Sequence, residues 1–310
     1  MRQFIQTLRE IFLKFFQIDR RLDELKINQA LAILASRRST SSCNVVDHEF
    51  KVFSQWGEDG IIQFLLQNIE IRNRTFIEFG VEDFSESNCR FLLMKDLWSG
   101  FVIDGSSVNI RRLRSSYYYW KYPLQSKASF ITSDNVCALL DESGFDKDVG
   151  ILSIDVDGVD YHLLQVLGAW RPSILIVEYN SIFGSERSVS VPYDPEFVRS
   201  VAHFSNLYYG ASLRAFSDLL DMRGYGLVGV NSVGSNAFFV RRDLLNERVV
   251  EVSPGLCFVH STFREARDER GQLTFLPAKV NRAVIGSLPL VDTNTGQLLR
   301  VEDLDDSVAS

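Results

Sequence analysis

Hydrophobic residues recur along the chain with two different spacings, and the first of these predicts a long helix. Residues 1–36 contain neither Gly nor Pro, and a mostly apolar stripe there advances alternately by four and three positions. The stripe consists of Phe4, Leu8, Ile11, Phe15, Ile18, Leu22, Leu25, Gln29 and Ala32. This spacing is typical of a helix that buries one seam against a partner. We therefore expect residues 1–40 to form an amphipathic, coiled-coil-like helix and a polar linker.

The partner of this helix is open at this stage, because three kinds of contact would bury the same seam. Self-association into a homo-oligomer agrees best with the alternating spacing. The alternatives are packing on the body of its own chain, and docking on a membrane surface or on a partner enzyme such as a glycosyltransferase.

From residue 45 the second spacing begins, in which short and almost continuous apolar runs alternate with amphipathic segments. The runs are TFIEFGV, SGFVIDGS, SKASFITSD, VGILSIDVDG and SILIVEYN, and they predict five strands joined by helices. Such strands form a parallel sheet that is covered on both faces. The runs GLVGVNS and NAFFVRRDL predict a hairpin that closes this sheet. We expect an α/β domain over residues 45–245, and an extension over residues 246–310 that wraps or caps its site.

The turn that follows the first predicted strand has the wrong composition for a phosphate-binding loop. Only Gly80 stands where a dinucleotide-binding turn has three glycines, and the carboxylates Glu82, Asp83 and Glu86 follow it. These carboxylates would repel a phosphate, so the turn is expected to bind a cationic or neutral ligand. Capping of the next helix is the simpler role for the three added carboxylates.

Polar side chains past the ends of the first three strands describe a nucleoside that carries an amino acid. Glu78 can pair with an ammonium group, and Gly80 lets a small ligand approach the backbone. Asp104 is an acceptor for ribose hydroxyls, and Asp134 with Asn135 can hydrogen-bond an adenine edge. S-adenosylmethionine has this makeup. Any one of these carboxylates alone is more simply a helix cap, but a succession of acidic strand ends is harder to explain in that way.

Several spaced motifs together resemble the FkbM-type class I methyltransferases and their relatives in surface-polysaccharide gene clusters. The resemblance covers roughly residues 50–240 and is carried by FSQWGEDGII, FIEFGVEDFSESN, GFVIDGS, FITSDNV and LSIDVDGVDY. It implies a Rossmann-like, mostly parallel seven-stranded sheet with helices on both faces, S-adenosylmethionine as cofactor, and a sugar or glycan hydroxyl as methyl acceptor. Through these motifs the resemblance adds further cofactor-binding candidates, which are Gln55, Glu58, Asn88, Ser106 and Asp155. The acidic turn after Gly80 departs from the family's Gly-x-x-x-Gly pattern.

Oxygen-bearing side chains at the ends of the fourth and fifth strands form a candidate metal site. Asp155, Asp157, Glu178 and Asn180 are ligands that suit Mg²⁺ or Mn²⁺ better than zinc. The arrangement is similar to that of the metal-dependent catechol O-methyltransferases. A metal would assist a sugar hydroxyl, which is a weak nucleophile at neutral pH. The alternative is that Asp155 and Asp157 bind helix N–H groups and cofactor without a metal.

Candidates for the reacting end and for the acceptor follow these strand ends. Asp157 is a candidate catalytic carboxylate, and His162, about one helical turn further on, is a candidate general base. Tyr193, Tyr208 and Tyr209 lie in segments expected over the mouth of the site, where aromatic rings stack on carbohydrate. The simpler interpretations are a packed histidine and a hydrophobic lid.

Composition excludes some functions and favours one compartment. The net charge of −7 and the pI near 5.3 argue against nucleic acid as a partner. The four cysteines are widely spread, which is typical of reduced thiols in a cytoplasmic protein. No apolar run approaches the ~20 residues of a membrane span. We expect a cytoplasmic protein, at the inner face of the membrane if the N-terminal helix docks there.

Two other functions compete with methyl transfer. The first is a catalytically silent methyltransferase-like module that the N-terminal helix recruits to a glycan-assembly partner. The second is a metal-dependent hydrolase that uses Asp155, Asp157 and Glu178, although no paired histidine ligands accompany them.

Overall fold

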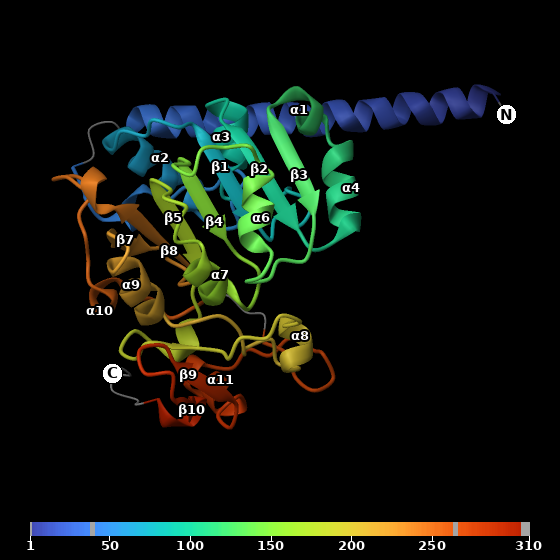
Figure 1. Cartoon of the computed structure of the whole chain (residues 1–310). Helices are drawn as coiled ribbons and strands as arrows, with labels where there is room; N and C mark the ends of the chain where they lie inside the picture. The colour runs from blue at the N-terminus through green and yellow to red at the C-terminus, as the bar shows by residue number, and fades with distance from the viewer. Residues whose placement is uncertain (1, 38–40, 263–265, 305–310) are drawn as a thin grey trace.

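The computed structural model describes residues 2–37, 41–262 and 266–304, and a seven-stranded sheet lies at its centre (Figure 1). The sheet order is β3-β2-β1-β4-β5-β8-β7, and β8 is antiparallel to both of its neighbours while the other pairs are parallel. The strands are β1 Thr75–Phe79, β2 Ser99–Asp104, β3 Leu124–Ala128, β4 Ile151–Ile154, β5 Ile174–Glu178, β7 Tyr225–Val230 and β8 Asn236–Arg241. The predicted Rossmann-like α/β fold is confirmed. Successive strands are added toward one edge of the sheet from β1 to β3 and toward the other edge from β4 onward. Folds of this type bind ligands at the point of reversal, between β1 and β4.

Helices cover both faces of the sheet because alternate strand residues point to opposite sides. In β1, Phe76 packs on one side, and Ile77 and Phe79 pack on the other. The first side carries α2 Glu58–Asn68, α3 Arg90–Lys95, α4 Ser107–Ser115 and α5 Tyr117–Lys121. The second side carries α6 Val136–Asp141, α7 Asp160–Val166 and α9 Leu213–Asp221. Two hydrophobic cores therefore clamp the sheet between them.

The third strand differs from its predicted position. It was expected to run to Asp134, but β3 ends at Ala128, where its partner β2 ends at Asp104. The apolar residues beyond it lie in a loop, in which Ile131 is buried in the core. The apolar run was therefore correct as a buried segment and wrong as a strand, because pairing stops where the neighbouring strand stops.

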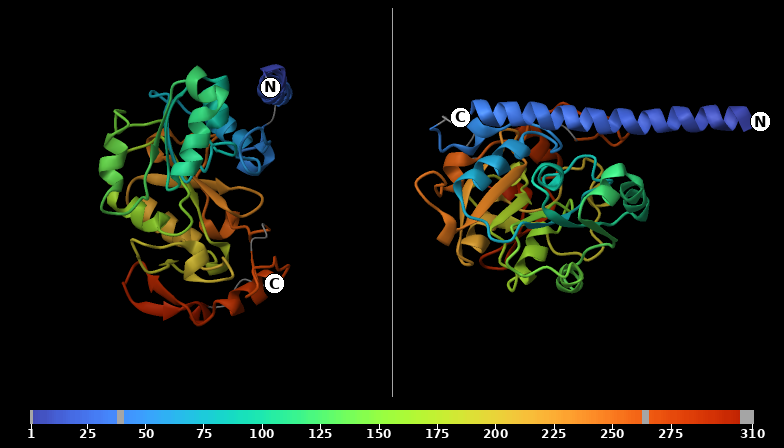
Figure 2. Two further views of the ribbon diagram at one scale, coloured as in Figure 1. Left: turned by 90° about the vertical axis from the view of Figure 1, so that its right-hand side faces the viewer. Right: turned by 90° about the horizontal axis from the view of Figure 1, so that it is seen from above.

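A small second layer, which we call the cap, combines residues 181–212 with residues 266–304. Its sheet has the order β10-β9-β6, and its own core includes Phe183, Val189, Leu207, Leu290 and Val301. It contains β6 Val189–Ser190, α8 Arg199–Ala202, α11 Ala278–Val284, β9 Pro289–Asp292 and β10 Leu298–Arg300. The cap lies below the main sheet in Figure 1, and Figure 1 and the left view of Figure 2 place α1 on the opposite side. The sequence predicts that residues 246–310 alone cap the site, whereas residues 181–212 also form part of the cap. Residues 263–265 and 305–310 of the predicted extension lie outside the described residues.

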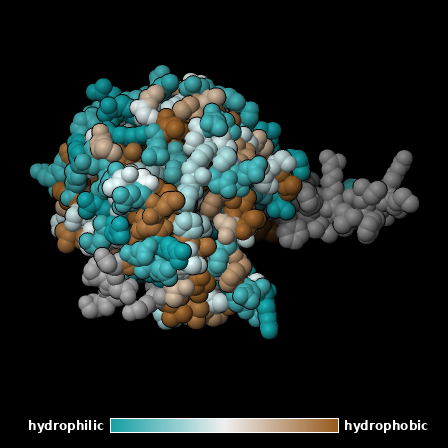
Figure 3. Space-filling model, turned by 60° about the horizontal axis from the view of Figure 1, so that its bottom comes forward, coloured by the Kyte–Doolittle hydropathy of each residue, from teal (hydrophilic) through white to brown (hydrophobic). Residues whose placement is uncertain are grey.

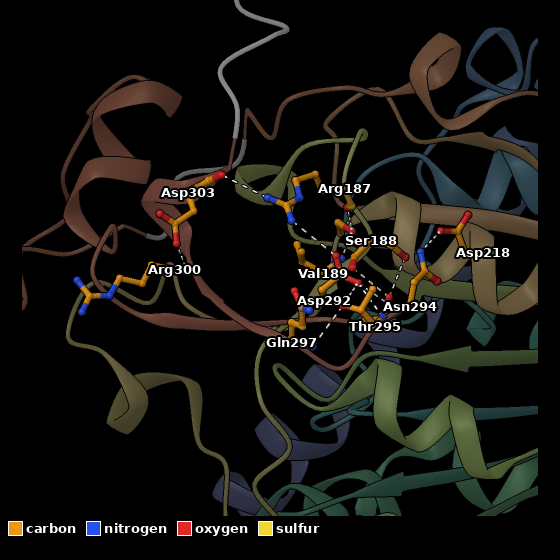
Figure 4. A network of polar contacts seen from close by, with 12 residues as sticks. Arg187, Ser188, Val189, Asp218, Asp292, Asn294, Thr295, Gln297, Arg300 and Asp303 are labelled. Carbon is orange, nitrogen blue, oxygen red and sulfur yellow. Dashed lines mark hydrogen bonds and ion pairs between the residues drawn. The ribbon is translucent and has the colours of Figure 1, made fainter.

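A polar network joins the β9–β10 hairpin to the first segment of the cap, residues 181–212 (Figure 4). Thr293 exchanges hydrogen bonds with Ser188, through its backbone N–H to the Ser188 carbonyl at 2.8 Å and between the two hydroxyls at 2.8 Å. Arg187 lies 3.6 Å from the Asp292 carboxylate. Asn294 reaches Asp218 on α9 at 3.3 Å. The hairpin therefore joins the cap to the helix layer of the main domain.

Figure 3 shows the face of the molecule that carries the cap, where hydrophobic side chains lie among hydrophilic ones. Val201 on α8 and Phe275 are 81% and 67% exposed. Among the described residues, no helix combines the length and the hydropathy that crossing a membrane requires.

The predicted N-terminal helix is confirmed as α1, Arg2–Ser36, and its N-terminal end extends beyond the body (Figures 1 and 2). It is attached through Asp23, Ile27 and Ala30, which face the body. Asp23 forms a buried ion pair with Arg90 at 2.5 Å and accepts a hydrogen bond from the Tyr117 hydroxyl at 2.7 Å. Part of the helix thus packs on its own chain.

The predicted seam is not the face that makes this contact. Ile18, Leu22 and Leu25 are 49%, 49% and 63% exposed, and Gln29 and Ala32 are also exposed. The other seam positions, Phe4, Leu8, Ile11 and Phe15, lie outside the described side chains. The apolar stripe and the docking face are therefore two different sides of one helix.

Candidate functional site

The ends of β1 and β4 approach each other so closely that no side chain fits at Gly80. Its φ of +69° is in the left-handed region, and a Cβ atom there would lie 1.5 Å from the Asp155 carbonyl oxygen. The Gly80 N–H donates to the Ile103 carbonyl at 2.9 Å. We had expected Gly80 to give a ligand access to the backbone, but the Asp155 backbone uses this space. The close approach at Gly80 thus fixes the backbone position from which the Asp155 side chain extends.

Glu78 is buried under the acidic turn and organises it. Its carboxylate accepts hydrogen bonds from the Ser87 hydroxyl at 2.6 Å and from the N–H groups of Asn88 and Cys89 at 2.8 and 3.2 Å. Burial raises the pKa of Glu78 to about 7, against the effect of these hydrogen bonds. Glu78 also lines a cavity of about 180 Å³. It therefore shapes one wall of the site in addition to any contact with a ligand.

Asp104 connects the same turn to β2. Its carboxylate accepts from the N–H of Glu82 at 2.8 Å and from the N–H of Ser106 at 2.7 Å. Glu82 has a φ of 47°, so the bond from Asp104 holds a residue in a disfavoured conformation. The Ser106 hydroxyl caps α4 by accepting from Asn109 N–H at 3.3 Å. Asp104, the predicted ribose acceptor, and Ser106, a predicted cofactor-binding residue, thus have structural partners, and neither lines the 180 Å³ cavity.

The residues predicted to hold adenine lie in the loop that follows β3. The side chain of Asn135 makes its hydrogen bonds within this loop. It accepts from the Thr132 N–H and donates to the Phe130 carbonyl, both at 2.9 Å. Asp134 is exposed. The ring of Phe130 is 48% exposed and lines a second cavity of about 340 Å³. An aromatic wall is therefore available where amide and carboxylate contacts were expected.

The Gly-Glu-Asp motif folds the segment before α2. One oxygen of Asp59 accepts from the N–H groups of Val52, Phe53 and Ser54 at 2.7 to 2.8 Å. Glu58 is fully buried and accepts from the side-chain amides of Asn231 and Asn236 at 2.7 and 3.0 Å. Glu58 thus joins α2 to the β7–β8 hairpin instead of lining the cavity.

Two other predicted residues line this cavity. Gln55 contributes an exposed side chain, and Asn88 donates its side-chain amide to the Ser153 hydroxyl at 3.1 Å. Asn236, which was not predicted as a site residue, lines it as well. The cavity is therefore lined by polar groups from β1, β4, β5 and β8.

Three carboxylates gather where β4 and β5 end. One oxygen from each of Asp155, Asp157 and Glu178 lies within 4.8 Å of the others. Oε2 of Glu178 is buried and has no hydrogen-bond partner. Asp157 has a φ of 57°, so its backbone is held in the left-handed region while its carboxylate points to this cluster. We call these three residues the acidic cluster.

Burial controls the charge of the acidic cluster. It raises the pKa of Asp155 well above its usual range, and repulsion from the Asp157 carboxylate adds to this effect. Burial likewise raises the pKa of Glu178, with repulsion from Asp155 as the next cause. A cation in the cluster would offset this repulsion, and carboxylate oxygens in this number are the donors that Mg²⁺ and Mn²⁺ take.

Arg199 is the functional residue that sequence reasoning missed. It comes from α8 in the cap, and its guanidinium lies 2.6 Å from the Asp157 carboxylate. The same group lies 3.8 Å from the centre of the Tyr209 ring. Its positive charge lowers the pKa values of Asp155 and Glu178, opposite to the effect of burial. No local spacing in the sequence connects α8 to the end of β4.

Two predicted site residues are not brought to the acidic cluster. Asn180 is buried, donates to the carbonyls of Leu207 and Tyr209 at 2.9 and 3.0 Å, and accepts from Ile182 N–H at 3.0 Å. It therefore caps a turn, and its role as a metal ligand stays a prediction. An amide next to a strand end serves equally well as a cap.

His162 faces the cap strand β6 instead of the acidic cluster. Its Nε2 lies 2.9 Å from the Val191 carbonyl, and its Nδ1 lies 3.3 Å from the Gln165 side-chain oxygen. The histidine thus has partners at both ring nitrogens and does not line the 180 Å³ cavity. This geometry favours the packed histidine over the general base.

Of the three tyrosines predicted to meet the acceptor, Tyr209 borders the acidic cluster through Arg199. The Tyr193 hydroxyl accepts from Ser133 N–H at 3.0 Å, and its ring lies against His162. The Tyr208 hydroxyl donates to the Pro289 carbonyl at 2.5 Å within the cap. Tyr193 therefore joins the cap to the main domain, and Tyr208 joins two segments within the cap.

The two cavities adjoin, because Asp157 and Arg199 line both of them. The smaller is polar and contains the acidic cluster. The larger is mixed, with the apolar side chains of Phe130, Val156 and Phe197 beside polar residues that include Ser200, Asn206 and Arg267. Together they form a cleft between the C-terminal edge of the sheet and the cap.

Replacing Gly80 by Ala is expected to separate the ends of β1 and β4. The matched control is Gly144→Ala, because Gly144 also has a φ of +69° and has nothing within 4 Å of its would-be Cβ. Gly144→Ala should cost only the conformational penalty of roughly 1–2 kcal/mol. Gly80→Ala should lower the free energy of unfolding by several kcal/mol more, as measured by urea denaturation. Equal losses in the two variants would show that the contact with Asp155 is unimportant.

Glu78 should make the protein less stable as the pH rises. Its pKa is about 7 in the folded chain and 4.5 as a free side chain, so the folded state binds more protons between these values. The free energy of unfolding therefore falls by roughly 3 kcal/mol from pH 4.5 to pH 7 on account of this group. Glu78→Gln should remove that part of the slope in urea denaturation. The control Glu142→Gln removes an exposed carboxylate and should leave the slope unchanged; a slope that Glu78→Gln also leaves unchanged would contradict the assignment.

Comparisons with known proteins gave matches among solved structures alone. No model of a protein family matches the chain, and no curated protein matches it. The chain is similar to the N-terminal domain of EvdMO1 with SAH bound, at 10% identity over 61% of this chain and 80% of that chain, with a TM-score of 0.37. It is similar to PKMT2 from Rickettsia typhi, at 10% identity over 61% and 53% of the two chains, with a TM-score of 0.39. It is also similar to an S-adenosylmethionine-dependent methyltransferase from Clostridium acetobutylicum, at 9% identity over 59% and 89%, with a TM-score of 0.38.

Proposed function

We propose that the protein is an S-adenosylmethionine-dependent O-methyltransferase of the FkbM type, which methylates a sugar hydroxyl of a surface glycan or of its precursor. The observation that carries the proposal is the acidic cluster at the ends of β4 and β5, beside the close turn of β1 at Gly80. Three carboxylates within 4.8 Å suit a cationic ligand and oppose a phosphate. The sugar assignment comes from the motif resemblance.

The cleft accommodates the cofactor in two parts. The ammonium and sulfonium groups are cationic and suit the polar cavity that Glu78 and Asp155 line. The adenine ring is apolar on its faces and suits the larger cavity between Phe130, Val156 and Phe197. Together, the cavities of about 180 and 340 Å³ fall within the size range of small-molecule sites.

The acidic cluster fits Mg²⁺ or Mn²⁺, as its carboxylate donors and the unpartnered Glu178 oxygen indicate. Asp155, Asp157 and Glu178 would hold the ion, which would supply a Lewis acid that makes the acceptor hydroxyl a better nucleophile.

In the proposed reaction, the chain chiefly positions the acceptor in line with the methyl group. The hydroxyl oxygen forms a bond to the methyl carbon as the carbon–sulfur bond breaks, and the hydroxyl proton passes to a carboxylate. Asp157 is our candidate for that carboxylate, since it is the exposed member of the acidic cluster. The cap covers the strand ends and so limits the access of water to the methyl group.

The silent module is the competing function, and one observation favours it. Glu78 and Asp104, the strand-end carboxylates expected to bind cofactor, already accept hydrogen bonds from backbone N–H groups. Structural roles alone could therefore retain them. A hydrolase is less well supported, because no histidine takes part in the one cluster of candidate metal ligands found among the described residues.

Binding of S-adenosylhomocysteine separates these functions. Isothermal titration, with and without Mg²⁺ or Mn²⁺, should detect binding to the wild-type chain, and Asp155→Asn should weaken it by at least about tenfold through loss of a nearby charge. The control Asp141→Asn removes an exposed carboxylate on α6 and should have no effect. No binding at high-micromolar ligand would exclude the methyltransferase, and binding unchanged by Asp104→Ala would exclude Asp104 as the ribose ligand. Screening of nucleotide sugars and glycan fragments would then identify the acceptor.

We also propose that α1 associates with a second copy of the chain. Ile18, Leu22 and Leu25 form an exposed apolar line on the side of α1 that the body does not use. Leu22 borders a groove of about 680 Å³ between α1, α4 and α5, which would receive side chains of the second helix. Attachment to a membrane surface or to a glycosyltransferase is the alternative use of the same line.

Replacing Leu22 and Leu25 together by Glu should lower the mass of the protein in solution to that of one chain. Leu31→Glu is the control, because Leu31 is 43% exposed on α1 but lies off the apolar line. Light scattering after size-exclusion chromatography would measure both masses. A wild-type protein of one-chain mass that binds vesicles through α1 would overturn the self-association proposal.

A further inference from the structure

Arg199 brings a positive charge from the cap to the acidic cluster. Among the described residues that line the 180 Å³ cavity, it is the only Lys or Arg. Its side chain is 13% exposed and lies 2.6 Å from Oδ1 of Asp157. Asp157, in turn, is one of the three carboxylates that could hold a metal ion. The guanidinium therefore holds one of the two oxygens of a candidate metal ligand.

The cap holds the guanidinium in this position from two further directions. Its Nε donates to the Asn206 carbonyl at 2.7 Å, and its plane lies 3.8 Å from the centre of the Tyr209 ring. Asn206 has a φ of 58°, so the carbonyl that accepts this bond belongs to a residue in the left-handed region. These contacts orient the guanidinium, which is rigid and planar, toward Asp157.

A divalent cation bound by Asp157 while this residue stays paired with Arg199 would bring two positive charges close together, and these charges repel each other. A cation bound by all three carboxylates would lie within a few ångströms of the guanidinium, in a partly buried site where charges are weakly screened. Either the cation stays out, or the guanidinium moves away from Asp157. In the second case, the contacts with Asn206 and Tyr209 strain or break with it.

We propose that Arg199 is a built-in competitor for the divalent cation at the acidic cluster and couples cation binding to the cap. While paired with Asp157, Arg199 keeps the affinity for the cation low and fastens residues 199–209 to the sheet. Cation binding displaces the guanidinium and loosens this segment, which borders both cavities. The inference rests on the metal site of the proposed function and names the residue that regulates it.

Titration with Mn²⁺, followed by electron paramagnetic resonance of the free ion, tests the competition directly. Arg199→Gln should bind Mn²⁺ about tenfold more tightly than the wild-type chain, because the repelling charge is gone. Arg199→Lys keeps the charge and should remain within about threefold of the wild type. Arg267→Gln is the matched control, since Arg267 lines the larger cavity from the cap but donates to the Gly271 carbonyl instead of to the acidic cluster.

Hydrogen exchange tests the coupling to the cap. In the wild-type chain, Mn²⁺ should speed exchange of amides in residues 199–209. In Arg199→Gln, exchange of this segment should be fast already and insensitive to Mn²⁺. Arg199→Met, which also removes the charge, provides the same comparison if the Gln variant does not fold.

The outcomes separate this inference from the proposed function. Unchanged or weaker Mn²⁺ binding by Arg199→Gln would overturn the competition, even if S-adenosylhomocysteine binds. No Mn²⁺ binding by any of the variants would also overturn it and would leave methyl transfer to be judged by S-adenosylhomocysteine alone. Mn²⁺ binding that follows the expected order, without S-adenosylhomocysteine binding, would support the competition and exclude the methyltransferase.

Discussion

The contact between Gly80 and the Asp155 carbonyl is the constraint on which the site depends. A separation that leaves no room for a Cβ atom fixes the end of β1 against the end of β4. The residue that follows β1 must therefore adopt the left-handed conformation, and the Asp155 side chain must enter the cleft at one defined place. The positions of the acidic cluster and of both cavities follow from this single approach of two backbones.

Buried carboxylates are the means by which the loops around the cleft are built. Glu78, Asp59, Asp104 and Asp160 each accept backbone N–H groups from a neighbouring loop. A loop held in this way needs no regular secondary structure, so its side chains remain free to line the cleft. The cost is the burial of charge, which raises the pKa values of Asp59 and Asp160 to about 6.

Much of the fold could be predicted from the sequence, because hydrophobic periodicity is a local signal and each strand carries its own. The ends of strands were less secure: β3 stops with its partner β2, and the sequence of β3 does not contain that information. Glu78, Asp155 and Glu178 were correctly expected at the strand ends. Arg199 could not be found, since its approach to Asp157 joins segments that lie 42 residues apart in the sequence. The general-base role of His162 stays a prediction, and its contact with the Val191 carbonyl also comes from a distant segment.

The cap has a consequence for the order in which the molecule is completed during synthesis. Residues 181–212 supply half of a small core, but Ile285, Leu290 and Val301, which close it, are made more than seventy residues later. The sheet can form as soon as β8 has left the ribosome, whereas Phe183, Val189 and Leu207 must wait in water for their partners. The nascent chain therefore passes through a stage in which the sheet is complete, the cleft is open and the apolar side chains of the cap core are exposed to water. A chaperone that recognises exposed apolar segments would bind this stage first.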